Sequence, residues 1–518
     1  MYHKKLKLSL CIASVLSAPT MAAQQQTTFE LNETTIQKIS QAVITQKVSC
    51  TDIVKSYIDR INQYDKSGKL PINSIIQVNP KALDAAKNID YMVKNGSNPG
   101  SLTCAPLIIK DNIDVKGLAT TAGSKALAKN IAKDDATQVE RLRDHGAIIL
   151  AKSNLAEFAW TPDYSESSLG GLTRNPYDVT RTTGGSSGGT AASVAANFGV
   201  AGLGTDTGAS IRGPSGLQNL VGLRPTLGAS SRDGVIPIWM TRDTAGPMAR
   251  NVTDAALLFE ATSGFDYKDS VTDKARFVPQ FKAKTALNKH ALNGMRVGVL
   301  RQMVTPESTD PEVLKRFEQA LESMKKQGAI LVDIKIPDLD TKANLPWPNR
   351  MKYDFNAYLT GQGKASPIKD FNQLVDSGLY VKEVKPFLEH EANITEQERV
   401  ENDKLDKIST SELQKTLVGE MNNQFVSVVV YPTWTQPPRK LKGLSGDGGN
   451  NNSMIAHAGL PAITVPMGFT HGNLPSSLQI AGRPFSESTI VGAAYSFEQT
   501  THFRKPPTSI PPAKLDKS

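Results

Sequence analysis

Two glycine- and serine-rich loops stand close together in the sequence and contain serines that could act as nucleophiles. Residues 183–189 read TGGSSGG and include Ser186 and Ser187, while residues 204–214 read GTDTGASIRGP and include Ser210. Loops with so few bulky side chains allow backbone N–H groups to close on a substrate. The small-residue segment between the loops favours a helix followed by a short strand. We therefore expect the chemistry of this protein to be organised around these two loops.

A lysine at the end of an apolar run is a candidate base for these serines. Lys110 ends the run PLIIK at 106–110, and polar residues follow it. We expect a buried strand over 106–115, in which a lysine has to find a partner or lose its charge. Without further context, a lysine that reaches water at the end of a strand is the simpler interpretation.

The first loop also matches the pattern G-x-S-x-G, the nucleophile elbow of α/β-hydrolases, but its surroundings do not fit. An elbow needs an apolar strand directly before it, whereas residues 174–183 are polar and turn-like. The histidines beyond the N-terminus lie in polar settings that do not suggest a catalytic base. The sequence contains no phosphate-binding G-x-x-x-x-G-K-[ST] motif and no His/Cys cluster with metal-ligand spacing, so we expect neither a cofactor nor a metal.

Three separated motifs, taken in order, resemble those of the amidase signature family. They are the tetrapeptide IKDN at 109–112, the loop 183–189 and the loop 204–214. Agreement extends to the stretches TRNPY at 173–177, GLPAITVPMGF at 459–469 and GRP at 482–484. The resemblance covers about residues 30–500. It implies an α/β fold, a single large domain with a mixed, mostly parallel central sheet covered by helices on both faces.

Carried over by motif, the family's Ser–cis-Ser–Lys triad falls on three residues of this sequence. The resemblance makes Ser210 the nucleophile, Ser186 the bridging serine and Lys110 the base. A serine hydroxyl needs a base before it attacks an amide, and a lysine accepts a proton at neutral pH only when its pKa is lowered from about 10.4. A proton would pass from Ser210 through Ser186 to Lys110 and return to the leaving amine.

The resemblance also implies that the second loop binds the oxyanion and is braced by a charge pair. The backbone N–H groups that would stabilise the oxyanion belong to Thr207, Gly208, Ala209 and Ser210. Asp206 and Arg212 are expected to pair and hold the turn, with two independent surface charges as the alternative. Ser187 is expected to form hydrogen bonds within its loop rather than to act as a catalyst.

The function implied by the resemblance is that of an amidase, similar to bacterial peptide amidases. It would cleave a carboxylic or peptide C-terminal amide to the acid and ammonia or amine through an acyl-enzyme. One alternative is the glutaminase-type subunit of a tRNA-dependent amidotransferase, and another is a non-catalytic amide-binding or scaffold protein. The net charge is +9, but the sequence contains no run of five or six like charges. We therefore expect a small-molecule or peptide amide as substrate and no binding of nucleic acid. The oligomeric state is left open.

Hydrophobic periodicity places the elements that would position these loops. A strand over 295–300, a helix from Pro311 to Gly328 and a strand over 329–334 indicate a parallel α/β unit. Further helices are expected near 28–65, 80–92, 135–144, 252–263 and 486–499, and further strands near 147–152, 426–431, 461–466 and 477–480. We expect one amidase domain over 24–518, with a catalytic core at about 100–260 and 425–500 and a variable helical cover at about 341–424.

The first 23 residues have the pattern of a secretory signal peptide. The basic stretch KKLK at 4–7 precedes a short apolar run at 8–16 and small residues at 17–23. We expect cleavage after Ala22 or Ala23, a periplasmic or secreted protein and no membrane attachment afterwards, with an uncleaved signal anchor as the alternative. Cleavage would leave Cys50 and Cys104, which could form a disulfide or remain as two buried free thiols.

Overall fold

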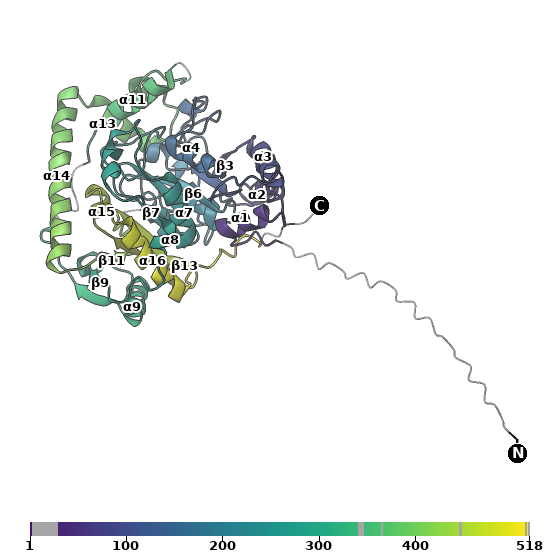
Figure 1. Ribbon diagram of the computed structural model, residues 1–518. Helices are drawn as coiled ribbons and strands as arrows, with labels where there is room; N and C mark the ends of the chain where they lie inside the picture. The colour runs from purple at the N-terminus through teal and green to yellow at the C-terminus, as the bar shows by residue number, and fades with distance from the viewer. Residues whose placement is uncertain (3–28, 340–346, 364–365, 445–447, 513–514, 516–518) are drawn as a thin grey trace.

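The structure is a computed structural model that describes residues 1–2, 29–339, 347–363, 366–444, 448–512 and 515 (Figure 1). Apart from Met1 and Tyr2, the expected signal peptide at 1–23 and its cleavage site lie outside these residues. Within the described part of the chain, no helix is long and apolar enough to cross a membrane.

One sheet of eleven strands runs through the molecule. In chain order its strands are β1 (Ile75–Val78), β2 (Pro106–Lys110), β3 (Ile148–Ser153), β6 (Ala201–Asp206), β7 (Val221–Arg224), β8 (Thr244–Ala249), β9 (Arg296–Val299), β10 (Ile330–Asp333), β11 (Val428–Pro432), β12 (Ala462–Thr470) and β13 (Leu474–Ala481). Across the sheet they lie in the order β1-β3-β2-β6-β8-β7-β12-β13-β11-β9-β10. Two short strands, β4 (Glu166–Ser167) and β5 (Gly171–Leu172), pair with each other in a separate sheet.

The expected α/β fold with a mixed sheet is confirmed, but its parallel and antiparallel parts are segregated. Parallel pairing joins β3, β2 and β6 on one flank, and β11, β9 and β10 on the other. The strands between β6 and β11 pair antiparallel, as does the edge strand β1. Parallel pairing, which was expected for most of the sheet, is therefore confined to its two flanks. Its centre includes strands joined by short turns, such as β12 and β13, and a short turn can connect only antiparallel neighbours.

Two groups of helices pack on this sheet. One connected group, which contacts strands such as β8 and β12, comprises α4 (Thr137–Asp144), α7 (Val252–Thr262), α8 (Ala283–Ala286), α9 (Pro311–Lys326) and α16 (Glu487–Thr501). The second group comprises α5 (Gly188–Ala195) and α6 (Arg212–Gly216), which contact each other and strands β2, β6, β7 and β12. Near the β1–β3 edge lie α1 (Ile36–Ile44), α2 (Cys50–Tyr64) and α3 (Ala82–Lys94), and α15 (Ser453–His457) precedes β12.

The expected helix that begins at Pro311 is confirmed as α9, and the residues at its two ends explain where it begins and stops. Asp310 caps it by accepting hydrogen bonds from the backbone N–H groups of Glu312 and Val313. Pro311 occupies the first helical position, where no N–H group is required. Gly328 adopts a φ of 90°, a left-handed conformation that stops a helix and that glycine adopts without strain. Local chemistry therefore sets both ends of this element.

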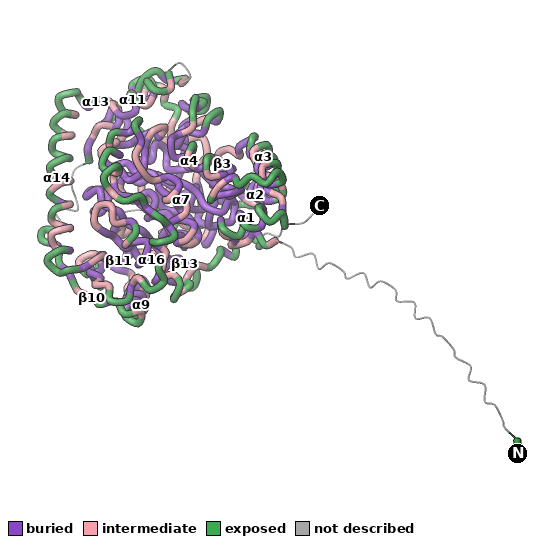
Figure 2. The backbone as a smooth tube through the Cα atoms, in the orientation of Figure 1, coloured by how far each residue is buried: buried purple, intermediate pink, exposed green. Residues whose placement is uncertain are grey.

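Most of the residues that the structure describes within 341–424 are helical. The helices are α11 (Met351–Gln362), α12 (Phe371–Ser377), α13 (Lys385–Asn393) and α14 (Glu396–Asn423). A capping box between Thr395 and Glu398 begins α14, which runs along the left edge of the molecule in Figure 1. Much of α14 is exposed in Figure 2, and its buried residues are Asp406, Leu413, Leu417 and Met421.

The strand expected over 106–115 ends at Lys110. The backbone N–H of Ile113 donates to the Lys110 carbonyl at 3.0 Å and closes a turn. Asp111, the second residue of that turn, forms a buried ion pair with Lys152 on β3, with the charged atoms 3.1 Å apart. The strand thus ends where a polar side chain pairs with a residue distant in the sequence. Hydrophobic periodicity does not reveal such a pairing. As a consequence, Lys110 lies at the carboxyl end of a parallel strand.

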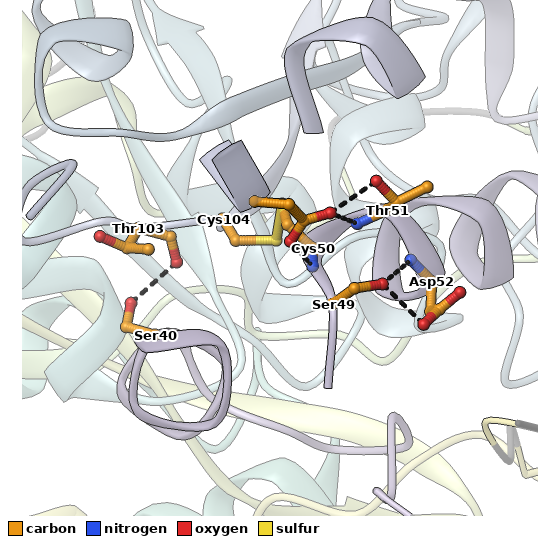
Figure 3. The surroundings of a disulfide bond; sticks show 8 residues. Ser40, Ser49, Cys50, Thr51, Asp52, Thr103 and Cys104 are labelled. Carbon is orange, nitrogen blue, oxygen red and sulfur yellow. Dashed lines mark hydrogen bonds between the residues drawn. A yellow bond between two sulfur atoms is a disulfide. The ribbon is translucent and has the colours of Figure 1, made fainter. Parts of the chain in front are cut away.

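Cys50 and Cys104 form a disulfide, which decides between the two states left open by the sequence (Figure 3). Both residues are fully buried. Cys50 begins α2, and its backbone N–H donates to Asp90 of α3 at 2.6 Å. Cys104 lies just before β2. The disulfide therefore ties the N-terminal helices to the strand that carries Lys110.

Candidate active site

Lys110 is completely buried at the end of β2. Its Nζ lies 2.7 Å from the Ser186 hydroxyl oxygen and 2.7 Å from the Thr205 hydroxyl oxygen. Burial lowers the pKa of Lys110 to about 7, although the negative charges of Asp206 and Asp243 oppose that shift. A lysine with this pKa is partly neutral at neutral pH and can accept a proton from a neighbouring hydroxyl.

The first loop is a tightly packed turn that fixes the position of Ser186. The peptide bond between Gly185 and Ser186 is cis, and Ser186 is fully buried. Its carbonyl oxygen accepts a hydrogen bond from the backbone N–H of Ala156 at 3.0 Å. A Cβ at Gly189 would lie 2.1 Å from the Asn154 carbonyl oxygen, so this loop requires glycine there. The glycines of the motif thus serve close packing of the loop against its neighbours.

A buried carboxylate between two arginines braces the second loop. Asp206 Oδ2 lies 3.1 Å from Arg212 Nε, and Asp206 Oδ1 lies 2.9 Å from Arg224 Nη1. Burial alone would raise the pKa of Asp206, but the charges of Arg212 and Arg224 outweigh it and hold the pKa below its ordinary value. The expected Asp206–Arg212 pair is present, and Arg224 joins it. Arg212 also donates to the Gly208 carbonyl at 2.9 Å, which fixes the course of the loop.

The backbone between β6 and α6 contains a series of N–H groups next to Ser210 in the chain. Among the described residues, none accepts a hydrogen bond from the N–H groups of Thr207, Gly208, Ala209 or Ser210. The loop's carbonyl groups, by contrast, are engaged: that of Gly208 by Arg212, and that of Ala209 by the N–H of Gly213 at 2.7 Å. The N–H groups are therefore available to a negatively charged oxygen, as an oxyanion site requires.

Ser210 adjoins the first loop through its backbone. It is 6% exposed, and its carbonyl oxygen accepts a hydrogen bond from the N–H of Ser187 at 3.3 Å. The Ser187 hydroxyl donates to the Thr205 carbonyl at 3.2 Å, so its contacts lie within the loops, as expected. The structure thus joins Lys110 directly to Ser186 and places Ser210 against the same loop.

Sequence reasoning missed several residues that position this site. Thr205 accepts hydrogen bonds from Lys110 and from the Asn112 amide, the latter at 3.2 Å. Asp243 accepts a hydrogen bond from the Thr207 hydroxyl, and burial raises the pKa of Asp243 to about 6. Thr205 and Asn112 lie inside recognised motifs, so their positions in the sequence could have marked them as residues of the site. Asp243 lies well beyond the second loop, and no local pattern marks it.

This geometry can support nucleophilic attack on a carbonyl group. A serine whose proton passes to a lysine of lowered pKa can add to a carbonyl carbon, and the available N–H groups can hold the negative charge that then forms on the carbonyl oxygen. In the part of the chain that the structure describes, no group of three or more His, Cys, Asp or Glu residues is placed to hold a metal ion.

Comparisons with known proteins agree with the resemblance in the motifs. A family model described as Amidase matches residues 52–491. A glutamyl-tRNA(Gln) amidotransferase subunit of Thermoanaerobacter pseudethanolicus is 32% identical over 93% of this chain and 99% of its own length. A probable amidase of Arabidopsis thaliana is 31% identical over 93% of each chain. The crystal structure of the native peptide amidase from Stenotrophomonas maltophilia matches with a TM-score of 0.81 at 30% identity, covering 92% of this chain and 98% of that one.

Proposed function

Since the chain belongs to the amidase family, whose enzymes act on amide C–N bonds, we propose that it is a hydrolase of carboxylic amides. The proposed substrates are amides such as the C-terminal amide of a peptide, and the products are the acid and ammonia or an amine. Similarity to the peptide amidase from S. maltophilia supports this substrate class.

In the proposed reaction, Ser210 Oγ attacks the amide carbonyl carbon while its proton passes to Ser186 and the Ser186 proton passes to Lys110. The N–H groups of residues 207–210 hold the negative oxygen of the tetrahedral intermediate. The proton returns through Ser186 to the leaving nitrogen, and the C–N bond breaks. Water then attacks the Ser210 ester by the same relay and releases the acid.

One observation carries this proposal: the 2.7 Å contact between the buried Lys110 Nζ and the Ser186 hydroxyl oxygen. Lys152, a buried lysine on the neighbouring strand, is a comparison residue with a structural role. It is paired with the Asp111 carboxylate at 3.1 Å. Lys110 instead faces two hydroxyl groups, so its pKa is free to fall with burial. The contrast supports Lys110 as a proton acceptor.

The direct test measures ammonia release from a panel of peptide amides, short aliphatic amides and aryl amides. Lys110→Ala and Ser186→Ala are each expected to lower kcat/KM by roughly 10³-fold or more, because each removes a member of one relay. The matched control is Ser187→Ala, one residue along the same loop, which should stay within about tenfold of the wild type. A wild-type rate in Lys110→Ala would exclude the proposed base.

A second candidate function is ammonia supply within a tRNA-dependent amidotransferase, which the 32% identity to a subunit of such an enzyme supports. The two candidates differ in what the isolated chain does. An amidase hydrolyses peptide or aliphatic amides without a partner. A subunit of the second kind uses glutamine, and its rate depends on partner subunits. Glutamine hydrolysis that appears only with such partners would favour the second candidate.

We propose that the protein is exported. The signal-like residues 1–23 support this proposal, as does the buried Cys50–Cys104 disulfide, because disulfides persist in oxidising compartments. Fractionation followed by mass spectrometry of the intact protein should find it outside the cytoplasm and shortened by about 22 residues. Full-length protein confined to the cytoplasm would contradict export.

A further inference from the structure

An aromatic cluster lies against the loop that is proposed to hold the oxyanion. A Cβ added to Gly208 would lie 3.0 Å from Cη2 of Trp347, so the edge of the indole contacts this loop. Trp347 is 41% exposed. Indole surface is therefore accessible to a substrate whose carbonyl oxygen binds at the loop.

Aromatic neighbours fix the position of the indole. Trp347 stacks on Trp239, with ring centroids 4.9 Å apart and 21° between the ring planes. It also meets His457 at a centroid distance of 4.7 Å in an edge-to-face contact. Trp239 is anchored in turn, because its Nε1 donates to Glu391 at 3.0 Å and its backbone N–H donates to Asp243 at 3.1 Å. Trp347 thus rests on a rigid platform.

Three arginines lie near this aromatic wall, and each contacts a carboxylate; Arg242 Cζ also lies 5.4 Å from the centroid of the Trp347 ring. The partners are Arg212 and Arg224 with Asp206, and Arg242 with Asp406 of α14. Burial, reinforced by the positive charges of the three arginines, lowers the pKa of His457 well below its ordinary value, so the imidazole is neutral.

We propose that Trp347 is the specificity-determining residue of an acyl-binding subsite that selects aromatic or large apolar acyl groups. This inference rests on the proposed amide hydrolysis at Ser210 and names its substrate class. When a primary amide is cleaved, the leaving group is ammonia, which is too small to cover an indole. The acyl group is therefore the part of the substrate that lies on Trp347, where it gains apolar burial and ring stacking. In a peptide amide the acyl group is the whole peptidyl group, and the part of it assigned to Trp347 is the side chain of the C-terminal residue.

The test compares N-acetyl-phenylalaninamide, N-acetyl-alaninamide and N-acetyl-glutamic acid α-amide as substrates. The wild-type enzyme should prefer the phenylalanine amide over the other two. Trp347→Ala should lower kcat/KM for the phenylalanine amide about tenfold, mainly through KM, and change the value for the alanine amide less than about threefold. Trp347→Phe, which keeps an aromatic face, should recover most of the loss.

The matched control is Tyr267→Ala, which removes an aromatic side chain that is 81% exposed. It should leave all three kcat/KM values unchanged. Labelling of Ser210 by a small alkyl fluorophosphonate, which has no aromatic acyl group, should proceed at the wild-type rate in Trp347→Ala and so reports an intact site. Equal losses on the phenylalanine and alanine amides, or a wild-type preference for the glutamic acid amide, would overturn the subsite while amide hydrolysis stands. A wild-type enzyme that neither hydrolyses any amide nor becomes labelled would overturn the proposed function, and the subsite with it.

Discussion

At the scale of single residues, Lys110 sets the pH range in which this site can act. Only the neutral lysine accepts a proton, and burial lowers its pKa to about 7. We therefore predict that kcat/KM for an uncharged amide rises as the pH increases through about 7 and levels off above it. Steady-state rates measured between about pH 5 and pH 9 provide the check. A profile that is flat, or that falls as the pH increases from about 6 to about 8, would contradict a lysine base.

The ion pairs of Asp206 lead to a prediction about the stability of the protein. Asp206→Asn keeps the shape of the side chain but leaves the buried guanidinium groups of Arg212 and Arg224 without their carboxylate. Removal of one partner from a buried charge cluster costs about 3–5 kcal/mol, so the free energy of unfolding should fall by about this amount. Denaturant titration measures it. Asp59→Asn, which breaks an exposed ion pair with Lys55, is the control and should leave the unfolding midpoint unchanged. Equal midpoints for the two variants would refute the bracing role.

The proposed triad could be predicted from the sequence because each member lies inside a recognisable motif. The residues that surround it could not. Arg224 reaches Asp206 from β7, and Asp406 reaches Arg242 from α14. These partners are distant in the chain, and no spacing or periodicity joins them. Trp347 likewise lies against Gly208 only because of the fold.

At the scale of elements, a helix or strand can be predicted from the sequence when its hydrophobic periodicity and capping residues agree with the way it packs. The unit formed by β9, α9 and β10 has clear periodicity and capping residues, and it lies close to where it was expected. In contrast, β7 and β8 were not expected, because Gly222 and Pro247 interrupt their patterns. Pairing with neighbours defines these two strands. Because such antiparallel strands form the centre of the sheet, parallel pairing is confined to its flanks.

The disulfide makes a prediction at this scale, because it joins α2 to the residues before β2 across a separation of 54 residues. In the chain-entropy model, a cross-link that closes such a loop contributes about 4 kcal/mol. We predict that the double variant Cys50→Ala/Cys104→Ala unfolds at a lower denaturant concentration by a corresponding amount, while its kcat/KM stays within about twofold at 25 °C. Reductant should shift the wild type toward the variant and leave the variant unaffected. Identical unfolding curves in the absence of reductant would show that this bond does not stabilise the protein.

At the scale of the whole molecule, the fold brings one site together from segments spread over most of the chain. Lys110 comes from a parallel flank of the sheet, the two serine loops flank α5 and β6, and the aromatic wall lies beside the helices at 351–423. The motifs predict the loops proposed to be catalytic, whereas the wall proposed to contact the acyl group depends on how the cover helices pack. The sequence therefore suggests the proposed chemistry, whereas the proposed substrate preference depends on contacts that appear only in the structure.

The central claim is that Ser210, activated through Ser186 and Lys110, forms an acyl-enzyme. The most direct measurement incubates the enzyme with a fluorophosphonate, digests it and locates the adduct by peptide mass spectrometry. The account predicts one adduct on Ser210, no adduct in Ser210→Ala, and labelling slowed by roughly 10²-fold or more in Lys110→Ala. An adduct on Ser186, or full-rate labelling of Ser210 in Lys110→Ala, would contradict it.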